Sequence, residues 1–328
     1  MSSYSLEGVT PKLQQQPATV PLPSPGRQRS PHAPLPTILA LLLSVALVFG
    51  TGAPIYVGFR NFGYDIFREY EYHSLTRATG EMVVRTSADF ELRMDQSDAR
   101  WAPLVLATAA DAADSLGSDL GIDVKQVREH QGGRKILLVM YPSRESLRDS
   151  FGWSAVENAL GAYWAGSIRL LSPSSWLAGF PADRISDAFK KDGPMVHELA
   201  HLLLDYVAKG NYPRWFTEGV AQYEEHEVTG FLWIEGDGRL VLNERYTLDQ
   251  LEDFDSLDDQ ALAYRQSLLM VAFLKDRAGA GGLKSLASDL GRQRSFWEAV
   301  RKDTGLSRQD FEAPFAAWLP KNIGRWSH

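Results

Sequence analysis

The chain has 328 residues, of which 44% are hydrophobic, and it carries 34 Lys and Arg against 41 Asp and Glu. This length is ample for a large core, and the 9 Trp, 12 Tyr and 15 Phe exclude a wholly disordered protein. The net charge of −7 argues against a nucleic-acid partner, because proteins that bind nucleic acids usually present a basic face. The absence of cysteine excludes disulfides, thiol catalysis and cysteine-ligated zinc, which leaves His, Asp and Glu as side chains that can bind a metal.

The N-terminal segment differs in composition from the rest of the chain. Nine of the 17 prolines fall in the first 60 residues, whereas all nine tryptophans lie beyond residue 100. The alternating prolines Pro21, Pro23 and Pro25 belong to a stretch that cannot bury a core. We therefore expect residues 1–35 to form a disordered, proline-rich arm.

An uncharged stretch follows this arm and predicts a membrane-spanning helix. No charged residue occurs from Ala33 to Phe59, and residues 38–49 are almost continuously Leu, Val, Ala and Ile. About 20 apolar residues in a helix span the hydrocarbon layer of a bilayer. We expect a transmembrane helix at 36–57, an uncleaved signal anchor rather than a cleaved signal peptide, followed by a juxtamembrane connector at 58–80. The short head and the long acidic body then favour a single-pass protein of the cell membrane with its body outside the cytoplasm.

The remaining residues, 81–328, show the pattern of a small mixed sheet followed by an α-rich half, which is an α+β class. Apolar runs and turn residues predict a strand at 81–86, a helix at 98–120, a buried strand at 135–141, a short helix at 143–151 and a strand at 167–171. Towards the C-terminus they predict a hairpin at 230–247 and helices at 258–277, 283–290, 295–302 and 307–319.

One segment carries residues with the chemistry of a metal site. The sequence HELAH places His197 and His201 four residues apart on a predicted helix that begins near Pro194. At this spacing both imidazoles leave the same face of the helix and can bind one Zn²⁺. Glu198 lies beside such a metal without having to bind it, and there it can take a proton from a metal-activated water. The alternative is a helix with two partly buried histidines and an ion-paired Glu198.

A second helix predicted from Tyr212 onward supplies a third ligand. A tight turn at Gly210 makes the two helices antiparallel neighbours, so Glu218 can face the histidine pair. Gly219, which carries only a hydrogen atom in place of a side chain, permits a close approach of the helices. Two His and one carboxylate, with a fourth position open for water, make a catalytic rather than a structural zinc site.

The motif HELAH, followed after 17 positions by the Glu of WFTEGVAQY, resembles the gluzincin metallopeptidases, and most closely the bacterial peptidase MA-like domains. The resemblance implies a zincin-like metalloprotease fold over residues 81–328, consisting of a small mixed sheet, an active-site helix and an α-rich half. It also implies that His197, His201 and Glu218 bind Zn²⁺ and that Glu198 is the general base. The substrate would be a peptide or protein.

The resemblance implies further roles that the residues themselves leave open. Tyr264 resembles the tyrosine that stabilises the oxyanion in this family, although it also fits a core tyrosine. Some gluzincins place an Asp four residues after the Glu ligand to orient a histidine, and this chain has Gln222 there. Asp205, one turn past His201, is an alternative for that role or a solvated helix residue.

Substrate binding is predicted at an edge strand. In zincins the edge strand ahead of the active helix commonly pairs with the substrate, and the resemblance implies that residues 167–171 do so by strand addition. The aromatic residues Trp153, Tyr163 and Trp164 precede this strand and fit either a substrate cleft or the core.

We therefore expect a membrane-anchored zinc peptidase. Two alternatives stay open at this point. One is a non-catalytic binding or scaffold module at the membrane that keeps the peptidase fold. The other is a zinc hydrolase of a non-peptide substrate, such as an ester or a cell-wall amide. The sequence does not indicate an oligomeric state.

Overall fold

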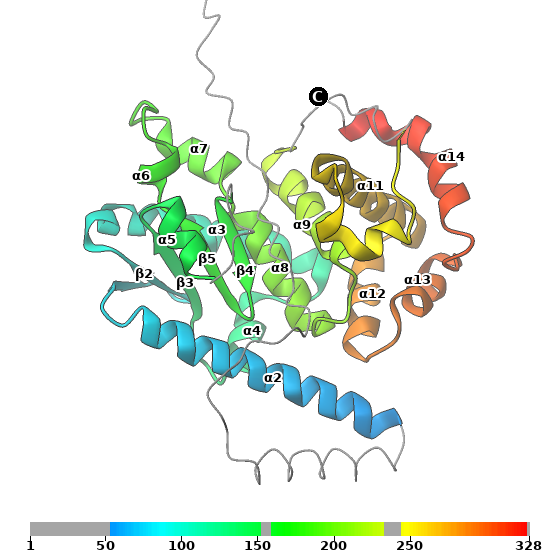
Figure 1. The fold of residues 1–328 in the computed structure, drawn as a ribbon, viewed down its shortest axis with the longest axis horizontal. Helices are drawn as coiled ribbons and strands as arrows, with labels where there is room; N and C mark the ends of the chain where they lie inside the picture. Colours follow the sequence, from blue (N-terminus) through cyan, green and yellow to red (C-terminus); the bar gives the residue numbers. More distant parts are fainter. Residues whose placement is uncertain (1–52, 152–158, 233–243, 327–328) are drawn as a thin grey trace, which may run out of the picture.

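The structure is a computed structural model and describes residues 53–151, 159–232 and 244–326 (Figure 1). It is α+β, with one five-stranded mixed sheet in the order β1-β2-β3-β5-β4. The strands are β1 Val83–Thr86, β2 Phe90–Met94, β3 Ile136–Tyr141, β4 Gly161–Trp164 and β5 Ser167–Leu171. Strands β2, β3 and β5 are parallel, and β1 and β4 run antiparallel at the two edges.

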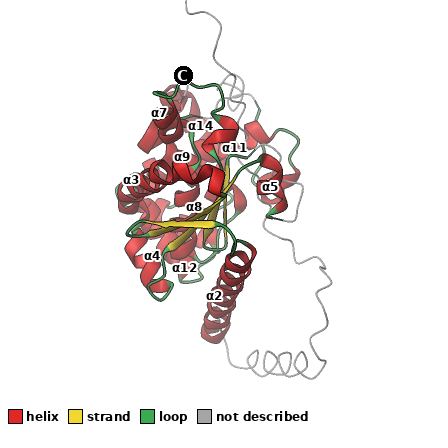
Figure 2. Cartoon of the chain, turned by 90° about the vertical axis from the view of Figure 1, so that its left-hand side faces the viewer, coloured by secondary structure: helices red, strands yellow, loops and turns green. Residues whose placement is uncertain are grey.

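The first half also has several helices. They are α2 Ala53–Ala78, the 3₁₀ helix η1 Gln96–Trp101, α3 Ala102–Leu120, α4 Val124–His130, α5 Arg144–Asp149, α6 Pro173–Trp176 and α7 Ile185–Asp192. Of these, α3, α4 and α5 contact the sheet. All six residues of the central strand β3 are buried, as expected for a strand covered on both faces. Figure 2 shows α3 on one side of the sheet and the short helix α5 on the other.

The second half is helical in the residues that the structure describes. Its elements are α8 Met195–Ala208, α9 Arg214–Thr229, η2 Gln250–Ser256, α11 Gln260–Ala278, α12 Gly282–Gly291, α13 Phe296–Thr304, α14 Glu312–Asn322 and η3 Ile323–Trp326. Every residue of α8 except Val207 is buried, because this helix lies between the sheet and the other helices. Helix α8 ends at Lys209 and Gly210, both left-handed, and a short loop leads into the neighbouring α9.

Most of the predicted elements are present, but the sheet has more strands than expected. Strands β1, β3 and β5 occur where the sequence predicts strands, and helices occur in all the predicted C-terminal ranges. Strands β2 and β4 were not predicted. Strand β5 lies between β3 and β4, so the prediction of residues 167–171 as an edge strand is wrong, and β4 is the edge. Most of the predicted hairpin, residues 233–243, and Trp153 lie outside the described residues.

The structure corrects the prediction of a transmembrane helix at 36–57. Residues 36–52 lie outside the described residues, and residues 53–57 begin α2. In the part of the chain that the structure describes, no helix combines the length and the apolar character needed to cross a bilayer. Helix α2 is long, but it carries six charged residues between Arg60 and Arg77 and makes a buried ion pair with the body. The predicted membrane-spanning element of the fold, and the cell-membrane location that depended on it, are therefore wrong.

Helices α9 and α11 approach each other closely at Gly219. A Cβ atom at this position would lie 2.3 Å from the carbonyl oxygen of Ser267 and 2.7 Å from Cγ2 of Val271. Only the absence of a side chain lets the two backbones lie this near. The contact fixes α9, one of the two helices that carry the candidate site, against the helical half.

We predict opposite effects of the same substitution at two helical glycines. Gly219→Ala should destabilise the protein by about 1–3 kcal/mol, because α11 must move to admit the methyl group. Gly63→Ala, on the exposed face of α2 with nothing within 4 Å of the new Cβ, should stabilise it by about 0.5–1 kcal/mol. Urea unfolding of both variants measures this difference. Equal effects would contradict the close approach at Gly219.

Candidate metal centre

The two histidines of HELAH lie one turn apart near the start of α8. Their Nε2 atoms are 3.2 Å apart, and both side chains are buried. The helix begins after Pro194, directly against the edge strand β4. Gly161 of β4 makes this possible, because a Cβ there would lie 2.8 Å from Cβ of Pro194 and 3.2 Å from Cγ of Glu198.

Glu218 of α9 completes a triangle of ligand atoms. Its Oε2 lies 3.5 Å from Nε2 of His197 and 3.6 Å from Nε2 of His201. A tetrahedral ion with bonds of ~2.0–2.1 Å separates its ligand atoms by about 3.3–3.4 Å, close to all three sides of this triangle. In the described part of the chain these three residues are the one group of His, Asp and Glu with a shared metal-binding geometry. The residues therefore fit a zinc ion.

The Nδ1 atom of each imidazole lies beside a side-chain oxygen of α9. Nδ1 of His201 lies 2.7 Å from Oγ1 of Thr217, and Nδ1 of His197 lies 3.2 Å from Oε2 of Glu225. With the proton on Nδ1 and donated to these oxygens, each Nε2 presents its lone pair to the centre of the triangle. Thr217 and Glu225 thus orient the candidate ligands, and both belong to α9.

An ion pair with Arg214 keeps Glu218 ionised. Nη1 of Arg214 lies 2.8 Å from Oε1 of Glu218, one turn away on the same helix. Burial alone would raise the pKa of Glu218, but the charge of Arg214 and the two imidazoles outweigh it and hold that pKa well below its usual range. Glu218 is therefore an anion with Oε1 on Arg214 and Oε2 turned to the histidines.

Glu198 lies between the two histidines in sequence and contacts the edge strand. Its Oε2 accepts a hydrogen bond of 2.6 Å from the backbone N–H of Tyr163 in β4. Burial raises the pKa of Glu198 to about 7, with Glu218 adding to this and His197 opposing it. The carboxylate is thus close to the ligand triangle and held by the sheet.

Tyr264 is fully buried in α11, where its ring packs edge-on against Phe254. Burial, together with the negative charge of Glu218, raises the pKa of Tyr264 well above its usual value, so its hydroxyl keeps its proton. Its backbone carbonyl accepts a hydrogen bond of 2.8 Å from Nε2 of Gln222. The role of Tyr264 at an oxyanion stays a prediction.

The structure gives other contacts to the two residues that the sequence offered as histidine orienters. The amide of Gln222 donates to the carbonyls of Glu218 and Tyr264 and so joins α9 to α11. Asp205 is fully buried and bonded to tyrosines and an arginine, so it is not a solvated helix residue. Glu225, which does contact a histidine, was missed, although its place two helical turns after Glu218 puts it on the same face.

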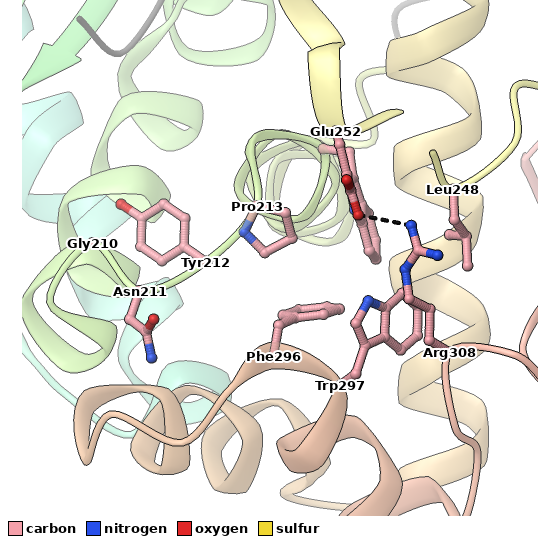
Figure 3. A pocket seen from close by; sticks show the side chains of 10 residues that line it. Gly210, Asn211, Tyr212, Pro213, Leu248, Glu252, Phe296, Trp297 and Arg308 are labelled. Carbon is pink, nitrogen blue, oxygen red and sulfur yellow. Dashed lines mark hydrogen bonds and ion pairs between the residues drawn. The ribbon is translucent and has the colours of Figure 1, made fainter. Parts of the chain in front are cut away.

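A pocket of about 300 Å³ lies at the far end of α8, around the loop that leads into α9 (Figure 3). Its lining contains none of the candidate site residues and consists of Gly210, Asn211, Tyr212, Pro213, Trp215, Leu248, Glu252, Phe296, Trp297 and Arg308. Arg308 forms ion pairs there with Glu252 and Asp249. The pocket is therefore separate from the ligand triangle.

Comparisons with known proteins do not identify the chain. No protein-family model matches it, and a search of curated proteins finds no match. The candidate site therefore rests on the geometry of its own residues.

We predict that Glu225→Gln weakens zinc binding by about 10- to 100-fold, because His197 loses a charged acceptor on Nδ1. The control is Glu227→Gln, which removes the same charge from an exposed position of the same helix and should leave the affinity unchanged. Competition with a chromophoric chelator measures both affinities. An unaltered affinity in the Glu225 variant would show that this contact does not support the metal.

Proposed function

We propose that this protein is a zinc-dependent hydrolase of peptide bonds. The observation that carries the proposal is the triangle of Nε2 of His197, Nε2 of His201 and Oε2 of Glu218, with sides of 3.2, 3.5 and 3.6 Å. Two neutral imidazoles and one carboxylate are the ligand set of catalytic zinc, whose fourth position stays open. Zinc bound there would polarise a carbonyl and lower the pKa of a water molecule.

Glu198 supplies the proton transfer in this proposal. It accepts one proton from the attacking water as the oxygen forms its bond to the peptide carbon, and it then gives that proton to the leaving nitrogen as the C–N bond breaks. Its burial beside the ligands excludes bulk water from this path. The products are a carboxylic acid and an amine, and the acid then gives its proton to the amine, which leaves a carboxylate and an ammonium group.

The edge strand β4 supports a peptide rather than another substrate. Residue 162 pairs with residue 169 of β5, and the backbone N–H of Tyr163 points the other way, towards Glu198. Successive residues of a strand turn their backbone groups to opposite sides, so Gly161 also faces away from β5. An extended peptide can pair with the outward backbone groups that Glu198 does not engage and bring its scissile carbonyl to the ligand triangle.

We predict that Glu198→Gln retains stoichiometric zinc and loses about 10²- to 10⁴-fold in the rate of peptide hydrolysis, because Gln cannot accept the proton. The measurement combines elemental analysis of the full chain with a digest of mixed peptides read by mass spectrometry. Glu227→Gln, with its exposed side chain, is the matched control and should keep full activity.

Two outcomes would contradict this proposal. A wild-type chain that binds no zinc would show that the ligand triangle is not a zinc site. An unchanged rate in the Glu198 variant would show that Glu198 is not the general base. Removal of zinc with a chelator should abolish activity and lower the unfolding temperature, and added zinc should restore both.

A further inference from the structure

Asp205, on the same helix as the histidines, accepts hydrogen bonds from four side chains outside that helix. Its Oδ1 accepts hydrogen bonds from the hydroxyls of Tyr64 at 2.5 Å and Tyr212 at 2.8 Å. Its Oδ2 accepts from Nη2 of Arg68 and from the hydroxyl of Tyr163, each at 2.5 Å. These partners come from α2, from the loop after α8 and from β4, so one carboxylate joins three parts of the fold.

The link to α2 is a buried ion pair. Nη2 of Arg68 also donates to the backbone carbonyl of Asp205 at 2.9 Å, and its guanidinium lies over the ring of Tyr206, 3.9 Å from the ring centre. Burial opposes ionisation of Asp205, but the charge of Arg68 and the hydroxyls outweigh it and lower the pKa of Asp205. Removing one partner of a buried ion pair leaves a charge without compensation, so this contact holds α2 against the body. Figure 1 shows the course of α2 along the molecule.

Tyr163 joins this network to the candidate base. Its hydroxyl donates to Asp205 and accepts from the backbone N–H of Gly166 at 3.0 Å, while its own backbone N–H donates to Glu198 at 2.6 Å. Among the described residues, the backbone N–H of Tyr163 is the one hydrogen-bond donor to the carboxylate of Glu198. The position of Glu198 therefore depends on the position of β4.

Strand β4 needs such an anchor. It has four residues, and among the described strands it pairs with β5 alone. An edge strand this short opens more easily than the interior of a sheet. The hydrogen bond from the Tyr163 side chain to Asp205 ties the strand to α8, the helix that carries both histidines and Glu198.

We propose that Tyr163 is a positioning residue for Glu198 and that Asp205, anchored by Arg68 of α2, holds Tyr163 in place. Helix α2 is then part of the active-site machinery rather than a connector. The role given to Glu198 rests on the proposed function, whereas the mechanical link from α2 to the backbone of β4 does not.

Two tyrosines allow a matched test of this relay. Tyr163→Phe and Tyr212→Phe each remove one hydroxyl from the same buried carboxylate, and both leave the aromatic ring in place. Both variants should lose stability to a similar extent. Only Tyr163 lies in β4 and contacts Glu198, so a purely structural role of Asp205 predicts the same behaviour for both.

The first readout is hydrogen exchange of the backbone amide at position 163 in the full chain, followed by mass spectrometry. Exchange should be at least about tenfold faster in Tyr163→Phe than in Tyr212→Phe, because only the first releases the strand. Equal exchange in the two variants would overturn the relay. This readout is independent of zinc and of activity.

The second readout is the rate of peptide hydrolysis. Tyr163→Phe should lower kcat about tenfold with KM within about twofold and zinc content unchanged, while Tyr212→Phe stays near the wild type. Equal kcat values for the two variants would show that Tyr163 does not position Glu198. If the wild type neither binds zinc nor cleaves peptides, the proposed function fails, and the exchange measurement alone decides the relay.

Arg68→Gln tests the contribution of α2, because it removes the charge that compensates Asp205 and keeps an N–H donor. Exchange at position 163 should again accelerate relative to the Tyr212 variant. A folded Arg68→Gln protein, judged by its circular dichroism spectrum, with wild-type exchange at this amide would exclude α2 from the relay.

Discussion

The candidate site depends on compensating the charges that its residues carry into the core. Glu198, Glu218 and Asp205 are all buried, and an isolated buried carboxylate would be too costly to keep ionised. The fold supplies one arginine for each of two of them, Arg214 for Glu218 and Arg68 for Asp205. These two ion pairs keep buried carboxylates of α8 and α9 compensated, one by α2 and one within α9.

The excess of negative charge around the ligand triangle favours a cation there. Glu198, Glu218 and Glu225 surround it, and among the described residues Arg214 is the arginine paired with one of them, Glu218. Burial opposes protonation of His197, yet Glu218 and Glu225 together raise its pKa well above the usual value. The surrounding carboxylates therefore favour positive charge at the position of His197. A divalent ion would meet the same demand with a better geometry, since all three ligand atoms lie near the spacing of a tetrahedral centre.

The sequence predicts the parts of the site that depend on short spacing. His197 and His201 share a helix face because they are four residues apart, and Glu218 follows after a tight turn. Arg68 could not be found in this way, because it meets Asp205 across 137 residues. Residues 167–171 are not an edge strand because β4, which the sequence pattern does not predict, pairs with β5 across a tight turn and covers its outer side. The uncharged stretch before residue 60 predicted a membrane helix from composition alone, whereas α2 carries charges that bind it to the body.

The supports of the metal ligands and of the base come from different parts of the fold. Thr217, Glu225 and Arg214 hold the histidines and Glu218, and all three lie on α9, which Gly219 brings against α11. Glu198 is held instead by β4, and through it by α8 and α2. Under the proposed function, metal affinity and proton transfer would therefore have separate supports that meet on α8. The side-chain contacts that orient the ligand triangle thus come from α9, whereas the contact that orients Glu198 comes from the sheet.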